Sequence, residues 1–249
     1  MTLFNALKTI FFLAIILYTA PFLFENIKKQ YIPLLEPRTP IGILHITKHL
    51  HNNHDLIEQL HCFFKDPIIQ GIVIKIDCAD AAPGTSQTVF HDIRQLKKEY
   101  PKPIIVLVEN MCLSGAYLIA SACDYIIAPE SALIGNIGQT FSAWSLKEIH
   151  EKTNNTFDII ENETYQQLTK QIALSRKLSL TTVHNWADGK IFTGTQAIAL
   201  GLINEIGSLC TVIKIIKEKA LIEGEIEWIE QSEKTPYLHI FFGNKSAIT

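Results

Sequence analysis

The chain has 249 residues, of which 47% are hydrophobic and 19% are charged, and this balance suits a globular fold with a substantial core. Its formal net charge is −3 and its lysines and arginines do not cluster, so composition gives no support to nucleic acid as a partner. The 5 cysteines form no CxxC pair, and this odd, scattered set fits neither a disulfide framework nor a zinc site.

The first expected element is the uncharged apolar segment at residues 9–24. With the apolar residues before Lys8 it reaches about twenty residues, enough to span a bilayer as a transmembrane helix. A cleaved signal peptide is the alternative, but its only charge would be Lys8 and no A-x-A cleavage pattern follows, so we favour an uncleaved anchor. Charges on the far side of the segment give only a slight cytoplasmic preference for the domain (Lys28, Lys29, Arg38).

Beyond a polar, proline-bearing stalk at residues 27–40, short apolar runs alternate with amphipathic stretches. We expect strands at 41–46, 68–77, 103–109, 125–129 and within 201–207, with a glycine-bounded segment at 133–138. Helices are expected at 53–64, 87–99, directly after Ser114, at 164–178 and within 183–202. Because β-branched runs between helices are typical of buried parallel strands, the sequence predicts an α/β fold of parallel β-α-β layers.

Ser114 follows the strand expected at 103–109 and precedes Gly115 and a predicted helix. In a parallel sheet this position would direct the hydroxyl out of the carboxyl edge, and the Gly115 N–H at a helix N-terminus could stabilise an oxyanion. A serine before a helix is by itself more often a cap. Gly84 lies in the preceding strand-to-helix loop, and since neighbouring loops converge at this edge it could supply a second donor. Together the three residues predict an acyl-transfer site in outline.

The stretch at 108–138, VENMCLSGAYLIASACDYIIAPESALIGNIG, resembles the nucleophile block of the signal peptide peptidase A (SppA, protease IV) family, the S49 serine peptidases, which have a ClpP/crotonase-like fold. The residues that carry this resemblance are Ser114, Gly115, Ala116, Tyr117, Asp124, Gly135, Ile137 and Gly138. Upstream, GIVIKID with Pro83-Gly84 is similar to the family's strand and oxyanion loop. Downstream, residues 188–207 are similar to its closing helix and strand.

The resemblance implies a ClpP/crotonase-like layered parallel sheet and a ring-like homo-oligomer. It places the domain on the extracytoplasmic side of a bacterial inner membrane, against the slight charge preference. We therefore expect a transmembrane anchor at 1–26, a stalk at 27–40, an S49-like peptidase domain at 41–212 and a C-terminal extension at 213–249. No cofactor and no metal are expected. Four histidines near residues 49–61 are interpreted as a surface loop.

The chain departs from the family's pattern in the oxyanion loop, in the glycine-bounded segment and, most importantly, at the expected base. Thr85, Asn136 and Gln139 stand where the family has glycine, serine and valine. Family members use a lysine whose pKa is lowered by desolvation, but the segment that would carry it is shortened or missing here. Lys170 is the nearest substitute, although its spacing favours a solvated helix face. Three further lysines fit less well, and a neighbouring protomer or His91 could act instead (Lys147, Lys152, Lys177).

Two functions follow. The first is a membrane-anchored serine endopeptidase that cleaves remnant signal peptides or other hydrophobic peptides, with Ser114 as nucleophile, Lys170 as base and Gly84 and Gly115 as oxyanion donors. Apolar residues near the serine would suit apolar substrate side chains (Leu113, Tyr117, Leu118). The second is a catalytically inactive scaffold that binds peptides or membrane proteins. A crotonase-like thioester enzyme is a third and more distant reading.

Overall fold

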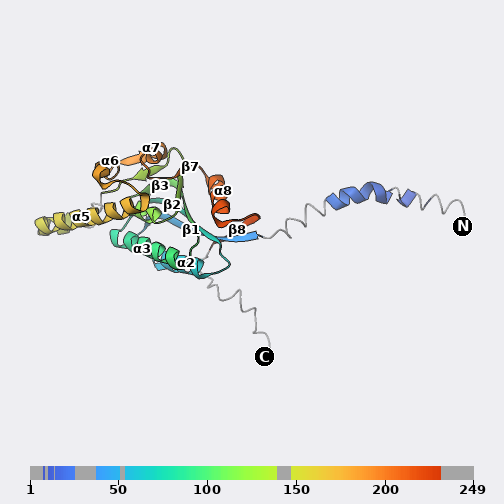
Figure 1. Ribbon diagram of the computed structural model, residues 1–249, viewed down its shortest axis with the longest axis horizontal. Coiled ribbons are helices and arrows are strands. Elements are labelled where there is room, and N and C mark those ends of the chain that lie inside the picture. Colours follow the sequence, from blue (N-terminus) through green and yellow to red (C-terminus); the bar gives the residue numbers. More distant parts are fainter. Residues whose placement is uncertain are drawn as a thin grey trace, which may run out of the picture. The chain divides into compact units, whose positions relative to one another are not determined.

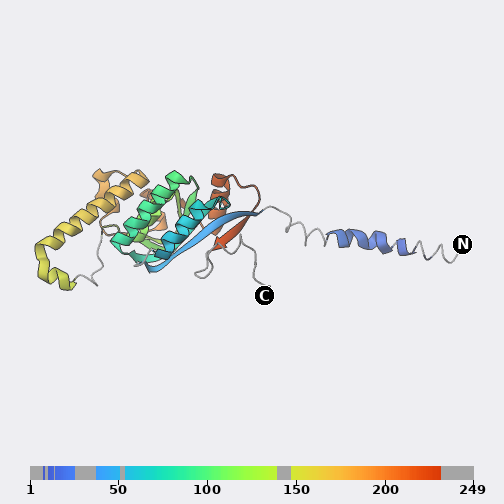
Figure 2. The ribbon, with the colours of Figure 1, turned by 90° about the horizontal axis from the view of Figure 1, so that it is seen from below.

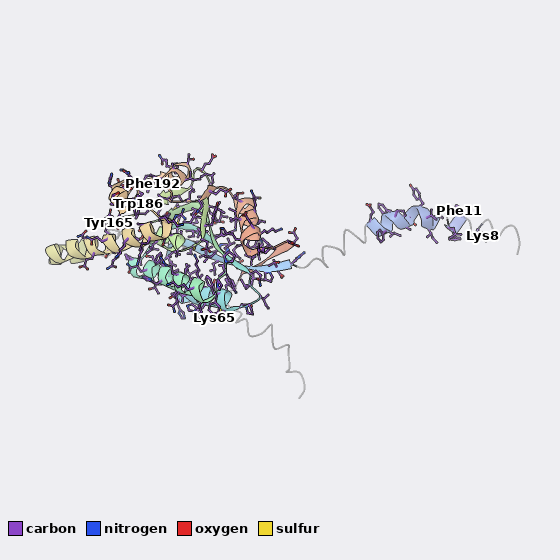
Figure 3. The ribbon with its side chains drawn as sticks, in the orientation of Figure 1. Lys8, Phe11, Lys65, Tyr165, Trp186 and Phe192 are labelled. Atoms are coloured by element: carbon purple, nitrogen blue, oxygen red, sulfur yellow. The ribbon has the colours of Figure 1, made fainter. Side chains whose placement is uncertain are left out.

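The computed structural model describes residues 8, 11–13, 15–25, 38–50, 54–138 and 147–230. The chain divides into two compact units, Met1–Arg38 and Thr39–Thr249. In the first unit, residues 8, 11–13 and 15–25 are helical, and Figure 3 labels Lys8 and Phe11 there. Within the described residues, we find no helix that combines the length and the apolarity needed to cross a membrane. Of the anchor expected at 1–26, residues 1–7, 9, 10, 14 and 26 lie outside the described residues.

The second unit is built on one sheet of eight strands. Its strands are β1 (Arg38–Leu50), β2 (Gly71–Ala81), β3 (Ile104–Leu113), β4 (Tyr125–Ala128), β5 (Leu133–Gly135), β6 (Ile191–Thr193), β7 (Glu205–Ile206) and β8 (Glu225–Glu230). The order is β6-β5-β3-β2-β1-β8, with β4 beside β3 and β7 beside β4. The expected parallel pairing is confirmed from β1 through β3 to β4, β5 and β7. Since β6 pairs antiparallel with β5, the sheet is mixed.

Helices cover both faces of this sheet (Figures 1 and 2). They are α2 (His54–Lys65), α3 (Pro83–Glu99), α4 (Gly115–Ser121), α5 (Lys147–Arg176), α6 (Val183–Trp186), α7 (Gly194–Ala199) and α8 (Leu209–Ala220), with a 3-10 turn at Leu180–Thr182. The larger core lies between one face of the sheet and α2 to α5. The smaller core lies on the opposite face, where α8 packs over β2 and β3.

The strands that lead to the candidate site are longer than the sequence predicts. β2 continues to Ala81 because its last residues keep pairing with β1, and Leu50 lies opposite Ala81. α3 begins at once with Pro83 in its first turn, where the fixed φ of proline favours a helix start. The connection expected between the strand at 68–77 and the helix at 87–99 is therefore mostly strand and helix. β3 likewise runs to Leu113, so Ser114 follows the strand directly.

The region at 183–202 also differs from the expected helix, turn and helix. β6 lies between α6 and α7 because its backbone completes the edge of the sheet beside β5. Trp186 belongs to the larger core, Tyr165 and Phe192 pack against it, and Figure 3 shows the three at the same end of the domain. The Tyr165 hydroxyl donates to the Ala187 carbonyl at 2.8 Å, and its ring packs over Gly138. These contacts fix α5 against the chain that follows β5.

Candidate active site

Ser114 lies on a strained turn between β3 and α4. Its φ of 55° and ψ of −126° lie in a region that residues with a side chain rarely adopt, at a cost on the order of 1–3 kcal/mol. Its N–H donates to the Gly135 carbonyl at 2.8 Å, so the turn is tied to the end of β5. The side chain is 5% exposed. The end of β5 therefore holds the backbone of this turn in place despite the strain.

Gly115 brings the turn of Ser114 against the end of β2. A Cβ atom at position 115 would collide with the Ala81 carbonyl oxygen and lie 2.8 Å from Ser86 Oγ. Ser86 is itself buried, and its hydroxyl donates to the Pro83 carbonyl at 2.9 Å. The prediction that the two strand-to-helix connections converge is therefore confirmed at this contact.

Gly84 occupies the first turn of α3, where backbone N–H groups have no partner within the helix. It is exposed, and a Cβ atom there would meet nothing within 4 Å. Its carbonyl accepts a hydrogen bond of 2.8 Å from Thr88 Oγ1. Gly84 is thus near the same edge, one residue beyond Pro83, but it is not among the residues that line the Ser114 pocket.

A narrow pocket adjoins Ser114. It is lined by Ser114 and Gly115 together with Ala81, Pro83, Ser86, Gln87, Leu118, Thr164 and Leu168. Its cavity volume is about 10 Å³, roughly the space of a single water molecule. Three helices thus enclose the serine: the start of α3, the start of α4 and the second half of α5.

Lys170 is not brought to this pocket. It is exposed on α5, two residues after Leu168, and therefore points about 200° around the helix from the side chain that lines the pocket. His91 is exposed on α3, where its Nε2 lies 3.2 Å from Gln171 Nε2. The side chains of Lys147 and Lys152 lie outside the described residues, and Lys177 is exposed just beyond α5.

Sequence reasoning missed the residues that α3 and α5 contribute. Thr164 and Leu168 are one helical turn apart, so their spacing marks one face of α5, but nothing local indicates what that face meets. Side-chain pairs join the two helices, with Gln87 Nε2 donating to Gln167 Oε1 at 3.1 Å and Arg94 lying 3.5 Å from Ser175 Oγ. These pairs align α5 along α3 beside the serine.

Tyr117 is a core residue rather than a substrate contact. Its side chain is fully buried, and its hydroxyl donates to the Leu202 carbonyl at 2.6 Å. Burial raises the pKa of this phenol well above its usual range. The prediction that it faces apolar substrate side chains is therefore wrong, because α4 directs it into the core. Leu118 does line the pocket, whereas Leu113 does not.

Other motif residues have structural partners. Asp124 accepts a hydrogen bond of 2.9 Å from the Ile104 N–H and pairs with Lys97 at 2.5 Å, which joins the start of β3 to α3. Gly135 and Gly138 have φ of 115° and 118°, which a side chain would disfavour. The motif thus specifies the frame around Ser114 as well as the serine.

A larger cavity of about 470 Å³ lies at the other end of α4, away from Ser114. Two of the three cations that line it, Lys97 and Arg94, have partners within the domain. Lys97 pairs with Asp124 and donates to the Ala122 carbonyl, and the Arg94 guanidinium lies 5.6 Å from the centre of the Phe90 ring. The smaller pocket beside the serine is therefore the candidate active site.

Comparison with known proteins identifies the family of this chain. The profile of Peptidase family S49 matches residues 96–162 and 142–223, which together span just over half of the chain.

Individual relatives match part of the chain. A protein of Methanocaldococcus jannaschii, provisionally named a protease, is 27% identical over 182 residues, or 63% of this chain and 58% of its own length. The chloroplastic serine protease SPPA of Arabidopsis thaliana is 25% identical over 194 residues, or 67% of this chain and 28% of its own. Protease 4 of Haemophilus influenzae is 27% identical over 169 residues, or 57% of this chain and 27% of its own. The chain thus spans less than two thirds of the length of each of these relatives.

The fold is similar to that of the ClpP protease catalytic domain from Plasmodium falciparum. The TM-score is 0.50 at 16% identity, over 67% of this chain and 84% of the other. At this identity the likeness shows the fold alone. The match to the family profile includes the strained serine turn, α4 and the glycine-rich segment after β5, and the chain belongs to peptidase family S49.

Proposed function

We propose that this protein is a serine endopeptidase that works by acyl transfer at Ser114. The observation that carries the proposal is the turn at φ 55° and ψ −126°, held at the carboxyl edge of the sheet beside a pocket. Strained backbone of this kind persists where the surrounding structure enforces it, and it gathers at active sites. Membership of the S49 family supports the same activity.

In the proposed reaction, Ser114 Oγ attacks the carbonyl carbon of a peptide bond. The hydroxyl proton passes to a general base, and the N–H groups of Gly115 and Gly84 stabilise the negative oxygen of the tetrahedral intermediate. The C–N bond then breaks and the base gives the proton to the leaving amine. Water hydrolyses the ester on Ser114, which releases a carboxylic acid and restores the hydroxyl.

Lys170 is the proposed base, and its exposed position favours action across a protomer boundary. In a homo-oligomer, an exposed lysine of one copy can approach the serine of the next, where desolvation would lower its pKa. Mixing inactive Ser114→Ala and Lys170→Ala proteins should then restore part of the activity, since some interfaces join an intact serine to an intact lysine. Full activity of Lys170→Ala alone would exclude this residue as the base.

The proposed substrates are remnant signal peptides or other hydrophobic peptides at a bacterial inner membrane. The apolar segment at 9–24 would anchor the chain, with the domain on the extracytoplasmic side. Recovery of the expressed chain in the soluble fraction after alkaline carbonate treatment would contradict the anchor.

The experiment that tests the activity is labelling of the full chain with a fluorophosphonate probe, read by intact mass. We expect one adduct on the wild type and none on Ser114→Ala. Absence of an adduct on folded, assembled wild type would contradict an activated serine.

A catalytically inactive scaffold that binds peptides or membrane proteins is the second candidate. It is favoured by the composition of the Ser114 pocket, because the described residues that line it include no lysine and no histidine. A scaffold would capture the same partners with Ser114→Ala as with the wild type, and neither protein would carry an adduct.

A further inference from the structure

The size of the pocket beside Ser114 is set by α5. Thr164 and Leu168 are the residues of α5 in its lining, which also includes Ala81, Pro83 and Leu118 of α4. With these side chains in place, the cavity volume is about 10 Å³. This is roughly the space that a single water molecule needs, so the pocket as it stands leaves room for only a small group beside Ser114.

The wall contributed by Leu168 belongs to the packed core. Leu168 is 6% exposed, and Ile172 and Ala173, next on the same helix, are also buried in the larger core. Close-packed interiors resist the displacement of a buried side chain, so the pocket cannot widen by a simple rotamer change at the surface. Leu168 therefore limits the space beside the serine.

Two contacts hold this wall in place. Gln167 accepts a hydrogen bond of 3.1 Å from Gln87 of α3, which itself lines the pocket. At the other side of α5, the Tyr165 hydroxyl donates to the Ala187 carbonyl at 2.8 Å. Together they fix Leu168 between the helix that begins at Pro83 and the chain that follows α6.

Building on the proposed peptidase function, we propose that Leu168 and Thr164 restrict the enzyme to peptides with a small residue at the acyl side of the cleaved bond. The accepted residues are glycine, alanine and serine. Their side chains fit beside Ser114 while its Oγ forms the ester with their carbonyl carbon and the C–N bond breaks. A leucine or phenylalanine at that position would collide with Leu168.

The test measures kcat/KM of the full chain on peptides that differ only in the residue before the cleaved bond: alanine, leucine or phenylalanine. We expect the wild type to prefer the alanine peptide over the leucine peptide by at least about tenfold, in line with discrimination by a few methylene groups. In Leu168→Ala the preference should fall by about tenfold or more. Leu168→Val, a milder change that keeps the core better filled, should lower it to a smaller extent.

Leu174→Ala is the matched control. It removes a leucine from the same helix, but Leu174 is 68% exposed and does not line the Ser114 pocket. Its preference for alanine should equal that of the wild type.

An unchanged preference in folded Leu168→Ala and Leu168→Val, or equal cleavage of all three peptides by the wild type, would overturn the selectivity while leaving the peptidase function intact. Failure of the wild type to cleave any peptide and to take up the fluorophosphonate would overturn the function and the selectivity together.

Discussion

At the scale of single residues, Ser114 and Gly115 set the shape of the turn between β3 and α4, and each position restricts which residue can occupy it. Ser114 accepts an unfavourable φ of 55° because its N–H is bonded to Gly135 and its carbonyl accepts the Tyr117 N–H at 3.0 Å. Gly115 has no space for a side chain, since α4 starts in contact with Ala81 and Ser86. The serine is thus presented by backbone contacts on both sides.

Gly115→Ala should destabilise the domain by about 2 kcal/mol or more, because the new methyl group must displace the Ala81 carbonyl or Ser86. Denaturant unfolding of the variant and the wild type measures the difference. Gly84→Ala is the matched control. It adds the same methyl group in open space in a helix, where alanine is favoured over glycine by up to about 1 kcal/mol. Equal stabilities of the two variants would contradict the close approach.

At the scale of elements, α4 and α5 are positioned by polar contacts to the chain at 201–204. The Tyr117 hydroxyl of α4 donates to the Leu202 carbonyl. The Arg176 guanidinium at the end of α5 donates to the Gly201 carbonyl at 3.0 Å and to Asn204 Oδ1 at 2.7 Å. The closing segment of the family motif therefore orients both helices that border the serine pocket.

Tyr117→Phe should lower the free energy of unfolding by about 1–2 kcal/mol, since the buried Leu202 carbonyl loses its donor. The rate of Ser114 labelling per folded molecule should stay within about twofold of the wild type, because Tyr117 does not line the pocket. Tyr125→Phe is the control. Its hydroxyl bonds Glu205 at 3.1 Å in a part-buried position, so its loss should cost less. A large loss of labelling in folded Tyr117→Phe would indicate a direct role in the site.

At the scale of the whole molecule, the larger core buries groups that ionise in alkaline solution. Cys112 and Cys123 are buried in the larger core, and burial raises the pKa of both thiols, that of Cys123 from 9.0 to about 12. In the unfolded chain these thiols would ionise near their ordinary pKa. Between pH 9.0 and about 12, the folded protein keeps the proton on the Cys123 thiol and the unfolded chain loses it. The free energy of unfolding must therefore fall as pH rises above about 9.

Cys123→Ala should make this alkaline loss of stability shallower by about 1.4 kcal/mol per pH unit, because one proton fewer is released on unfolding. Urea denaturation under reducing conditions at several values between about pH 8 and pH 11 measures the slope. Cys210→Ala, at an exposed cysteine, should leave the slope of the wild type unchanged. A slope for Cys123→Ala equal to that of the wild type would contradict the raised thiol pKa.

The sequence alone determines the elements whose signal is local. The β-branched runs mark β2 and β3, and the Ser-Gly pair marks the strand-to-helix turn at Ser114. The glycines at 135 and 138 reveal the turns after β5, because their backbone conformations disfavour a side chain. These features depend on neighbours within one turn or one strand, so a pattern in the sequence suffices to find them.

Only the tertiary structure decides which side chains meet Ser114. Leu168 and Gln87 reach the pocket because α5 packs along α3, and the bonded pair Gln87 and Gln167 is 80 positions apart in the chain. Lys170 lies on the exposed face of α5 that its spacing favours, but only the packing of α5 reveals that the opposite face, with Leu168, borders the serine. Helical periodicity tells which residues share a face, but the partner of that face follows from how distant elements pack to bury apolar surface.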